Sequence, residues 1–205
     1  MTLLSMAVGL ALAVERPDAP TAAVLTGGSA PGQWDASVSA GFPWFTARGQ
    51  VGLKGGWTPI VEVQSALWTR WQPSAGVGLR WVDQRWRVSG EVLGGWLVQT
   101  GTLARRGPSG ELRLKAGRAA GLWQPYLHAG SKHTLLMTRI RTDTADGDEV
   151  RWRAGHEWTL TGGVGTGIAV GRTWGLDVGM DLPWVGVPTL SIPGLHLGVV
   201  FGGGR

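Results

Sequence analysis

Residues Trp86–Val98, with the sequence WRVSGEVLGGWLV, alternate between two kinds of side chain. The even positions carry Trp, Val and Gly, whereas the odd positions include Arg87, Ser89 and Glu91. Successive side chains of a β-strand point to opposite faces, so this period of two predicts a strand with one apolar and one polar face. The same alternation continues through residues 150–170 and 174–184. The pattern therefore predicts an all-β chain.

Tryptophans stand at the ends of the alternating segments. Ten residues of strand rise about 33 Å, and at a tilt of about 40° they cover about 25 Å, the height of the apolar band on a transmembrane barrel. Tryptophan favours the two membrane–water interfaces. Four pairs spaced ten residues apart are thus predicted to form aromatic girdles: Trp34 and Trp44, Trp71 and Trp81, Trp86 and Trp96, and Trp174 and Trp184.

Alternation alone also fits a soluble sandwich or a lipocalin-like barrel, so sidedness needs a separate argument. Soluble folds turn a face of large aliphatic side chains inward. Here the polar face mixes Arg and Glu with Gly, and the apolar face carries tryptophans at its ends. We expect lipid on the apolar face, with Val61, Val77, Leu79, Val88, Val92, Leu176, Val178 and Met180 facing it.

Composition agrees with this reading. The chain has 35 glycines and no cysteine, and none of its apolar runs has the 18 or so residues that a membrane-spanning helix needs. The formal net charge is +5, but the basic residues are spread over many strands instead of forming a stripe or tail. A nucleic-acid partner is therefore not expected.

Ten strands are predicted, joined as a closed antiparallel up-and-down transmembrane β-barrel; eight or twelve strands are the alternatives. An even number returns both ends of the barrel to the periplasmic side, where connections are short. The longest loops, 99–109 and 141–149, fall on the other side. In the seventh strand the apolar residues change from odd to even positions, and a bulge near 131–133 would account for the change. The predicted strands are 34–42, 45–54, 58–68, 71–82, 85–98, 110–117, 124–140, 150–170, 174–184 and 192–202.

The first residues form a short apolar run that ends in Ala11-Leu12-Ala13. This ending is typical of a signal-peptide cleavage site, although no Lys or Arg precedes the run. Residues 1–13 are predicted to be a signal peptide and residues 14–33 a flexible lead-in. Residues 34–205 are the predicted barrel domain.

Over residues 34–202 the chain resembles the outer-membrane β-barrel proteins of Gram-negative bacteria. Its last strand, Leu195–Phe201, resembles the C-terminal alternating segment that the barrel-assembly machinery reads in this family. Members usually stop at the aromatic residue, whereas this chain continues with Gly202-Gly203-Gly204-Arg205. The resemblance implies an outer-membrane location, contact with outer-membrane lipids and lipopolysaccharide, and assembly by that machinery. It names no specific member and leaves the oligomeric state open.

The interior of such a narrow barrel is predicted to be filled by paired charges. Glu62, Glu91, Asp177 and Asp181 are the acids placed to receive Arg48, Arg80 and Arg87. The expected role is a structural or interaction barrel, and the alternative is a narrow, porin-like passive channel for small anionic solutes. The predicted polar network of the lumen comprises Arg48, Glu62, Gln64, Arg80, Arg87, Glu91, Arg113, Asp177 and Asp181, with Lys115 on the same face.

An outer-membrane enzyme is the third and least favoured class. The four histidines, at 128, 133, 156 and 196, are spread over three predicted strands without a metal-ligand spacing. Residues 162–167 (GGVGTG) lack the helix of a dinucleotide-binding loop, and their glycines instead make room for large side chains on facing strands. The acidic stretch 143–149 lacks the order of a Ca²⁺ loop. We therefore predict no catalytic residues, no cofactor and no metal.

Overall fold

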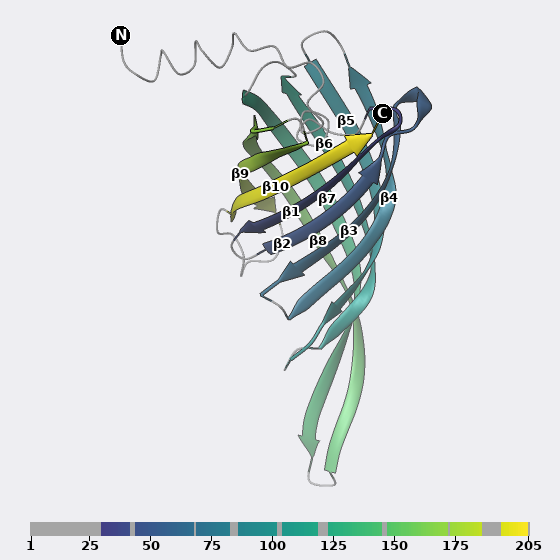
Figure 1. The fold of residues 1–205 in the computed structure, drawn as a ribbon. Helices are drawn as coiled ribbons and strands as arrows, with labels where there is room; N and C mark the ends of the chain where they lie inside the picture. The colour runs from purple at the N-terminus through teal and green to yellow at the C-terminus, as the bar shows by residue number, and fades with distance from the viewer. Residues whose placement is uncertain are drawn as a thin grey trace, which may run out of the picture.

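The structure is a computed structural model that describes residues 30–41, 44–67, 69–82, 86–101, 104–118, 123–144, 147–171, 173–185 and 194–204. Ten antiparallel strands close into one barrel (Figure 1). The predicted signal peptide and most of the lead-in lie outside the described residues. The strands are β1 (Gln33–Gly41), β2 (Trp44–Val51), β3 (Trp57–Ala66), β4 (Arg70–Val82), β5 (Trp86–Gln99), β6 (Arg105–Arg118), β7 (Trp123–Thr144), β8 (Gly147–Ala169), β9 (Trp174–Val185) and β10 (Gly194–Gly204).

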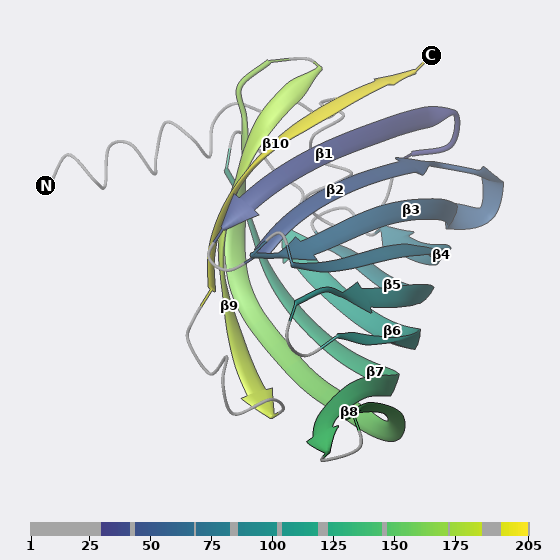
Figure 2. The ribbon, with the colours of Figure 1, turned by 90° about the horizontal axis from the view of Figure 1, so that it is seen from below.

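Each strand pairs with its neighbours in the chain, and β1 pairs with β10 from Gln33↔Gly204 to Gly41↔His196. Figure 2 shows the strands following one another in chain order around the wall. Closure gives every strand a partner on both sides, which removes the unpaired edge that hydrocarbon would not tolerate. The predicted strand number and the predicted closure are both confirmed. The glycines after Phe201 also belong to the barrel, because they continue the pairing of β10 with β1.

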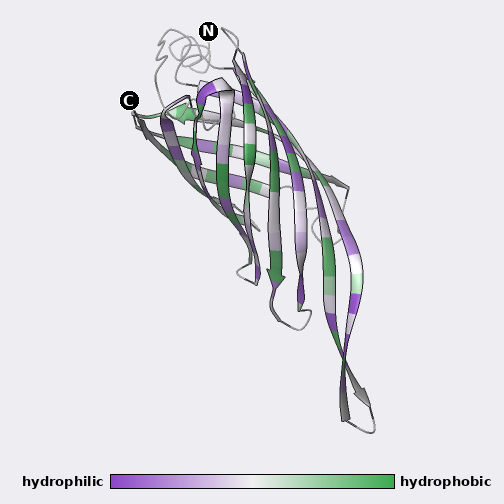
Figure 3. Cartoon of the chain, turned by 90° about the vertical axis from the view of Figure 1, so that its right-hand side faces the viewer, coloured by the Kyte–Doolittle hydropathy of each residue, from purple (hydrophilic) through white to green (hydrophobic). Residues whose placement is uncertain are grey.

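Hydrophobic and hydrophilic residues alternate along the strands (Figure 3), and this alternation separates an apolar outer face from a polar interior. On the outside, Val61 is 63% exposed and Val92 is 55% exposed. On the inside, Glu62 and Glu91 are buried. The eight aliphatic residues expected to face lipid all have the outward parity. Among the described residues, no helix combines the length and apolar character needed to cross a bilayer.

The two ends of the barrel differ. At the end where β1 begins and β10 ends, β2 and β3 are joined by a short 3-10 turn, Lys54–Gly56, in which Gly55 and Gly56 have φ of 77° and 82°. These left-handed values favour glycine. At the opposite end, the β7–β8 hairpin extends well beyond the other strands (Figure 1).

The predicted loops were too long at this second end. β5 ends at Gln99 and β6 begins at Arg105, and β7 and β8 remain paired as far as Thr144↔Gly147. The segment 141–149, which we expected to be a loop, is thus mostly strand. Local polarity indicated a loop there, but a two-stranded ribbon in water can carry polar side chains on both faces.

The predicted bulge in the seventh strand was wrong. β7 pairs in one continuous register with β8, without a shift. The apolar residues of this strand occur at both odd and even positions because both faces carry some. Leu136 points into the interior, where it is 7% exposed, while Leu135 and Met137 face outward. An irregularity occurs instead between β8 and β9, at Leu160/Thr161.

Trp44 does not join an outer girdle. It shares the parity of Arg48 and Gln50 on β2 and pairs with the buried Ala66, so it faces the interior, where the Arg70 guanidinium lies 5.8 Å from its ring. Two residues that are an even number apart on a strand share a face, so Trp44 and Arg48 could not lie on opposite sides. Six of the other tryptophans proposed for the girdles are exposed on the outside: Trp34, Trp71, Trp81, Trp86, Trp96 and Trp174. The side chain of Trp184 lies outside the described part of the chain.

Candidate functional site in the barrel lumen

Two bidentate ion pairs occupy the middle of the lumen. Arg48 donates from its two terminal nitrogens to the carboxylate oxygens of Glu91, at 2.8 and 2.7 Å. Arg113 donates in the same way to Glu62, at 2.7 and 2.6 Å. We call these four residues the arginine–glutamate cluster. Paired forks of this kind are among the strongest and most directional contacts between side chains.

The pairs of this cluster join strands that are not neighbours. Arg48 lies on β2 and Glu91 on β5, whereas Glu62 lies on β3 and Arg113 on β6. The side chains must therefore meet inside the barrel. A further contact of 3.5 Å from Arg48 to Glu62 ties the two pairs together. The side chain of Glu62 is only 1% exposed, so water has little access to the centre of the cluster.

Polar and apolar side chains extend this filling. Gln64 donates to Glu62 at 2.7 Å and accepts from the Lys132 ammonium at 3.1 Å. Glu111 accepts a hydrogen bond from Arg113. Three aliphatic side chains with the inward parity, Ile60, Leu93 and Leu97, are at most 2% exposed. The lumen at this level is packed by side chains.

A second group of side chains, the histidine–aspartate cluster, comes from β7, β9 and β10 and lies on the part of the wall formed by β7–β10. Its members are Tyr126, His128, Asp177, Asp181 and His196. The Tyr126 hydroxyl donates to Asp177 at 2.7 Å and lies 3.3 Å from Nε2 of His196. The other ring nitrogen of His196 is 3.2 Å from Asp181, which also contacts His128 at 2.6 Å.

Glycines make room for these rings. Register places Tyr126, Gly165, Gly179 and His196 side by side on four successive strands. A Cβ at Gly165 would collide with the Tyr126 ring, and one at Gly179 would stand 2.5 Å from the His196 ring. The two rings lean over the two glycines and meet. The expectation that glycines of 162–167 accommodate large side chains is confirmed at this site.

The predicted partners of Asp177 and Asp181 were wrong. Both acids have the inward parity, but they contact Tyr126, His128 and His196 instead of Arg80 or Arg87. Lys115 adds a positive charge beside them, with its ammonium 4.0 Å from the centroid of the Tyr126 ring. The physical reason is reach: β9 lies next to β8 and β10, far around the wall from β4 and β5.

Arginines stand at both ends of the lumen. Toward the projecting hairpin, Arg70 and Arg105 share Glu157, at 2.7 and 4.0 Å. Toward the termini, the inward-facing Arg80 and Arg87 lie on the adjacent strands β4 and β5. Among the described residues, the Nε atom of Arg87 is buried without a hydrogen-bond partner.

Sequence reasoning placed Asp177 and Asp181 in the lumen but missed their partners Tyr126, His128 and His196, together with Glu111 and Lys132. The histidines of this cluster, His128 and His196, lie on different strands, and no spacing relates them. One signal was present: Tyr126 and His128 lie opposite Gly165 and Gly163 in a predicted hairpin. A ring facing a glycine across a ladder indicates a side chain that leans over the neighbouring strand.

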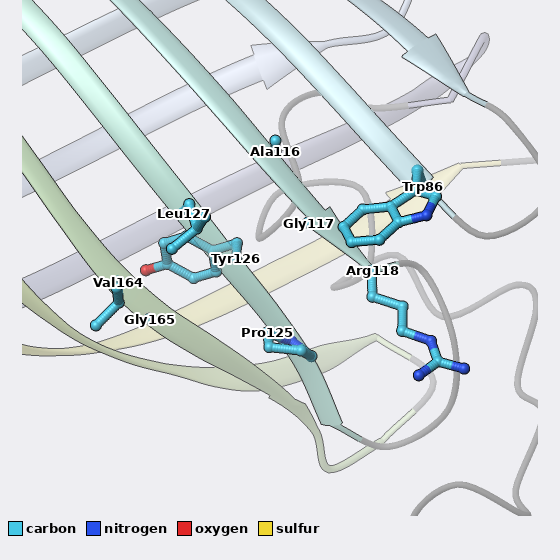
Figure 4. A pocket seen from close by; sticks show the side chains of 9 residues that line it. All are labelled: Trp86, Ala116, Gly117, Arg118, Pro125, Tyr126, Leu127, Val164 and Gly165. Carbon is cyan, nitrogen blue, oxygen red and sulfur yellow. The ribbon is translucent and has the colours of Figure 1, made fainter.

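Two other features offer less chemistry. Within the described ranges, no group of three or more His, Asp or Glu side chains is arranged to hold a metal ion. A groove of about 580 Å³ lies on the outer wall (Figure 4). Trp86, Leu127 and Val164 line it, and Arg118 is its one charged lining residue.

The comparisons with known proteins find only distant structural matches. No family model matches the chain, and no curated protein matches it. The N-terminal β-barrel domain of Pseudomonas aeruginosa OprF matches at 12% identity and a TM-score of 0.37, over 83% of this chain and 96% of that one. The KdgM porin matches at 11% identity and a TM-score of 0.34, covering 82% and 98%. The NanC porin matches at 13% and 0.36, also covering 82% and 98%.

Proposed function

We propose that this protein is an integral outer-membrane β-barrel whose lumen is closed by ion-paired side chains, and that it serves as a structural or interaction unit of that membrane. The outward valines and leucines support insertion into lipid, as do the exposed tryptophans near the strand ends. The end with the short turn, where β1 begins and β10 ends, fits the periplasmic side, and the projecting hairpin fits the extracellular side.

The observation that carries the closed lumen is the pair of bidentate contacts inside it. Arg48–Glu91 joins β2 to β5 and Arg113–Glu62 joins β3 to β6, so each pair spans two intervening strands within the lumen. Separating a buried ion pair is unfavourable, because each charge left without its partner costs several kcal/mol. A solute would have to separate these pairs in order to pass.

Conductance tests this proposal. The purified protein in a planar bilayer is expected to show little or no current. The double variant Arg48→Ser/Glu91→Ser removes one cross-lumen pair without changing the net charge, and we expect it to conduct. The matched control is Arg151→Ser/Glu149→Ser, which removes an exposed pair on the hairpin, outside the lumen. Large, stable openings in the unmodified protein would refute the closed lumen.

Membrane insertion needs its own measurement. Spin labels at Val92 and Val178, both exposed on the outer face, are expected to be accessible to a lipid-soluble quencher and shielded from a water-soluble one. The opposite result would contradict the membrane location. Arginine at Val92 should cost about 2–4 kcal/mol if this residue lies near the bilayer midplane.

A narrow anion path is the second candidate, and Arg87 favours it. Its Nε atom lacks a hydrogen-bond partner among the described residues, and Arg80 lies on the adjacent strand. A small anion entering from the end with the termini would meet both arginines. Under this alternative, current through the unmodified protein would be small and anion-selective, and Arg87→Gln would weaken the selectivity.

A further inference from the structure

The β7–β8 hairpin carries an outward-facing patch where it leaves the barrel. β6 stops pairing with β7 at Arg105↔Thr138, and within the described residues β8 pairs with β9 only from Leu160 onward. Beyond these points β7 and β8 continue as a two-stranded ribbon (Figure 1). The patch consists of Arg106, Arg139 and Trp152, with Leu135 and Met137 below them.

Register holds the three central residues of the patch together. Arg139 lies directly opposite Trp152, and Arg106 lies opposite Met137 on the next strand. The guanidinium of Arg106 stacks 4.5 Å from the centroid of the Trp152 ring. Trp152 is nevertheless 43% exposed, and Met137 is 42% exposed. The patch therefore offers two cations and a flat apolar surface on one side of the hairpin.

The charges of the patch are not neutralised from within. Neither Arg106 nor Arg139 forms an ion pair with a described residue, whereas Arg151, on the opposite face of the hairpin, is bound to Glu149 at 2.8 Å. Like charges on neighbouring strands repel each other, so an external anion would relieve the repulsion.

The apolar residues indicate what kind of anion fits. Leu135 and Met137 continue the outward apolar face of β7 toward the barrel, and both are more than 40% exposed. A soluble anion would gain nothing from them. An amphiphile would place its acyl chains against these side chains and its headgroup against the arginines, which bind phosphate through directional hydrogen bonds.

We propose that this patch binds the phosphate-bearing headgroup of an anionic glycolipid in the outer leaflet. The inference rests on the proposed orientation, with the hairpin on the extracellular side. It assigns a ligand class to one surface of the barrel and is independent of whether the lumen conducts.

The test is a titration of the barrel, in nanodiscs of zwitterionic phosphatidylcholine, with diphosphorylated lipid A or its dephosphorylated form. Bound lipid is counted by native mass spectrometry. The variant Arg106→Gln/Arg139→Gln should lose about 10- to 30-fold in affinity for the phosphorylated form. The control Arg151→Gln/Arg153→Gln removes two charges from the other face and should change the affinity less than about twofold.

Equal losses in the two variants would reduce the effect to net charge and overturn the proposal, as would no loss in either. Tight binding of the dephosphorylated lipid to the unmodified protein would also overturn it. Heat-modifiable migration on gels checks that each variant is folded. Failure of the proposed function would appear separately, as large conductance or exclusion from the nanodisc.

Discussion

The lumen contains two polar clusters that are built on opposite principles. The arginine–glutamate cluster uses long, flexible side chains from β2, β3, β5 and β6 that meet in the middle of the barrel. The histidine–aspartate cluster uses rings that lie close to the wall, over the glycines of β8 and β9. In the first cluster, long side chains extend from the wall to the middle of the lumen. In the second, glycines on the wall leave the space that the rings occupy. A barrel of ten strands therefore satisfies its buried charges in two ways, according to how much space the wall leaves.

The largest expected effect distinguishes the central cluster from a surface pair. Glu62→Ala removes the carboxylate that joins Arg113, Arg48 and Gln64. Because it leaves a buried arginine without this partner, we expect a loss of about 3–5 kcal/mol in the free energy of unfolding. The exposed Glu149→Ala is the control, with a change of at most about 1 kcal/mol.

Urea unfolding in lipid vesicles, followed by tryptophan fluorescence, measures both variants. The double variant Glu62→Leu/Arg113→Met sharpens the result, because replacing a buried pair by apolar residues often restores stability. If Glu62→Ala were no more destabilising than Glu149→Ala, the cluster would not be a sealed unit.

A smaller effect is expected in the histidine–aspartate cluster. Tyr126→Phe keeps the ring over Gly165 but removes the hydroxyl that donates to Asp177. A hydrogen bond to a charged group contributes about 1.5–3 kcal/mol, and the free energy of unfolding should fall by that amount. The same unfolding measurement applies. An unchanged unfolding midpoint would mean that water replaces the hydroxyl, so that this cluster, unlike the central one, is open to solvent.

The smallest effect tests the glycines of β8 and β9 that lie beneath the rings. Gly165→Ala places a methyl group against the Tyr126 ring and should cost about 1–3 kcal/mol through overpacking. Gly94→Ala is the matched control, because a Cβ there has no neighbour within 4 Å. Thermal unfolding, compared between the two variants, gives the difference. Equal behaviour would show that the rings move aside easily, and the wall would then not define the position of the second cluster.

Much of the architecture could be predicted from local patterns. Alternation and tryptophan spacing were sufficient for ten strands, for closure and for the outward valines, because the period of a strand depends only on its own residues. The same reasoning placed Arg48, Glu62 and Glu91 on one face. The predicted orientation of Trp44 and the predicted bulge before Leu136 were wrong, because they followed from residue type and not from the alternation of the strand. The reasoning also went wrong in the hairpin, because polar segments form ribbons as well as loops.

The sequence by itself determined which side chains enter the lumen, because the pleat sends every second residue inward. Only the tertiary structure decided which of them meet. Tyr126 and His196 are 70 positions apart, and they come into contact because the registers of β8 and β9 place Gly165 and Gly179 between them on the curved wall. Arg48 reaches Glu91 across 43 positions, past the two strands β3 and β4. Such contacts depend on the registers of several strand pairs taken together, and a pattern within one segment does not contain that information.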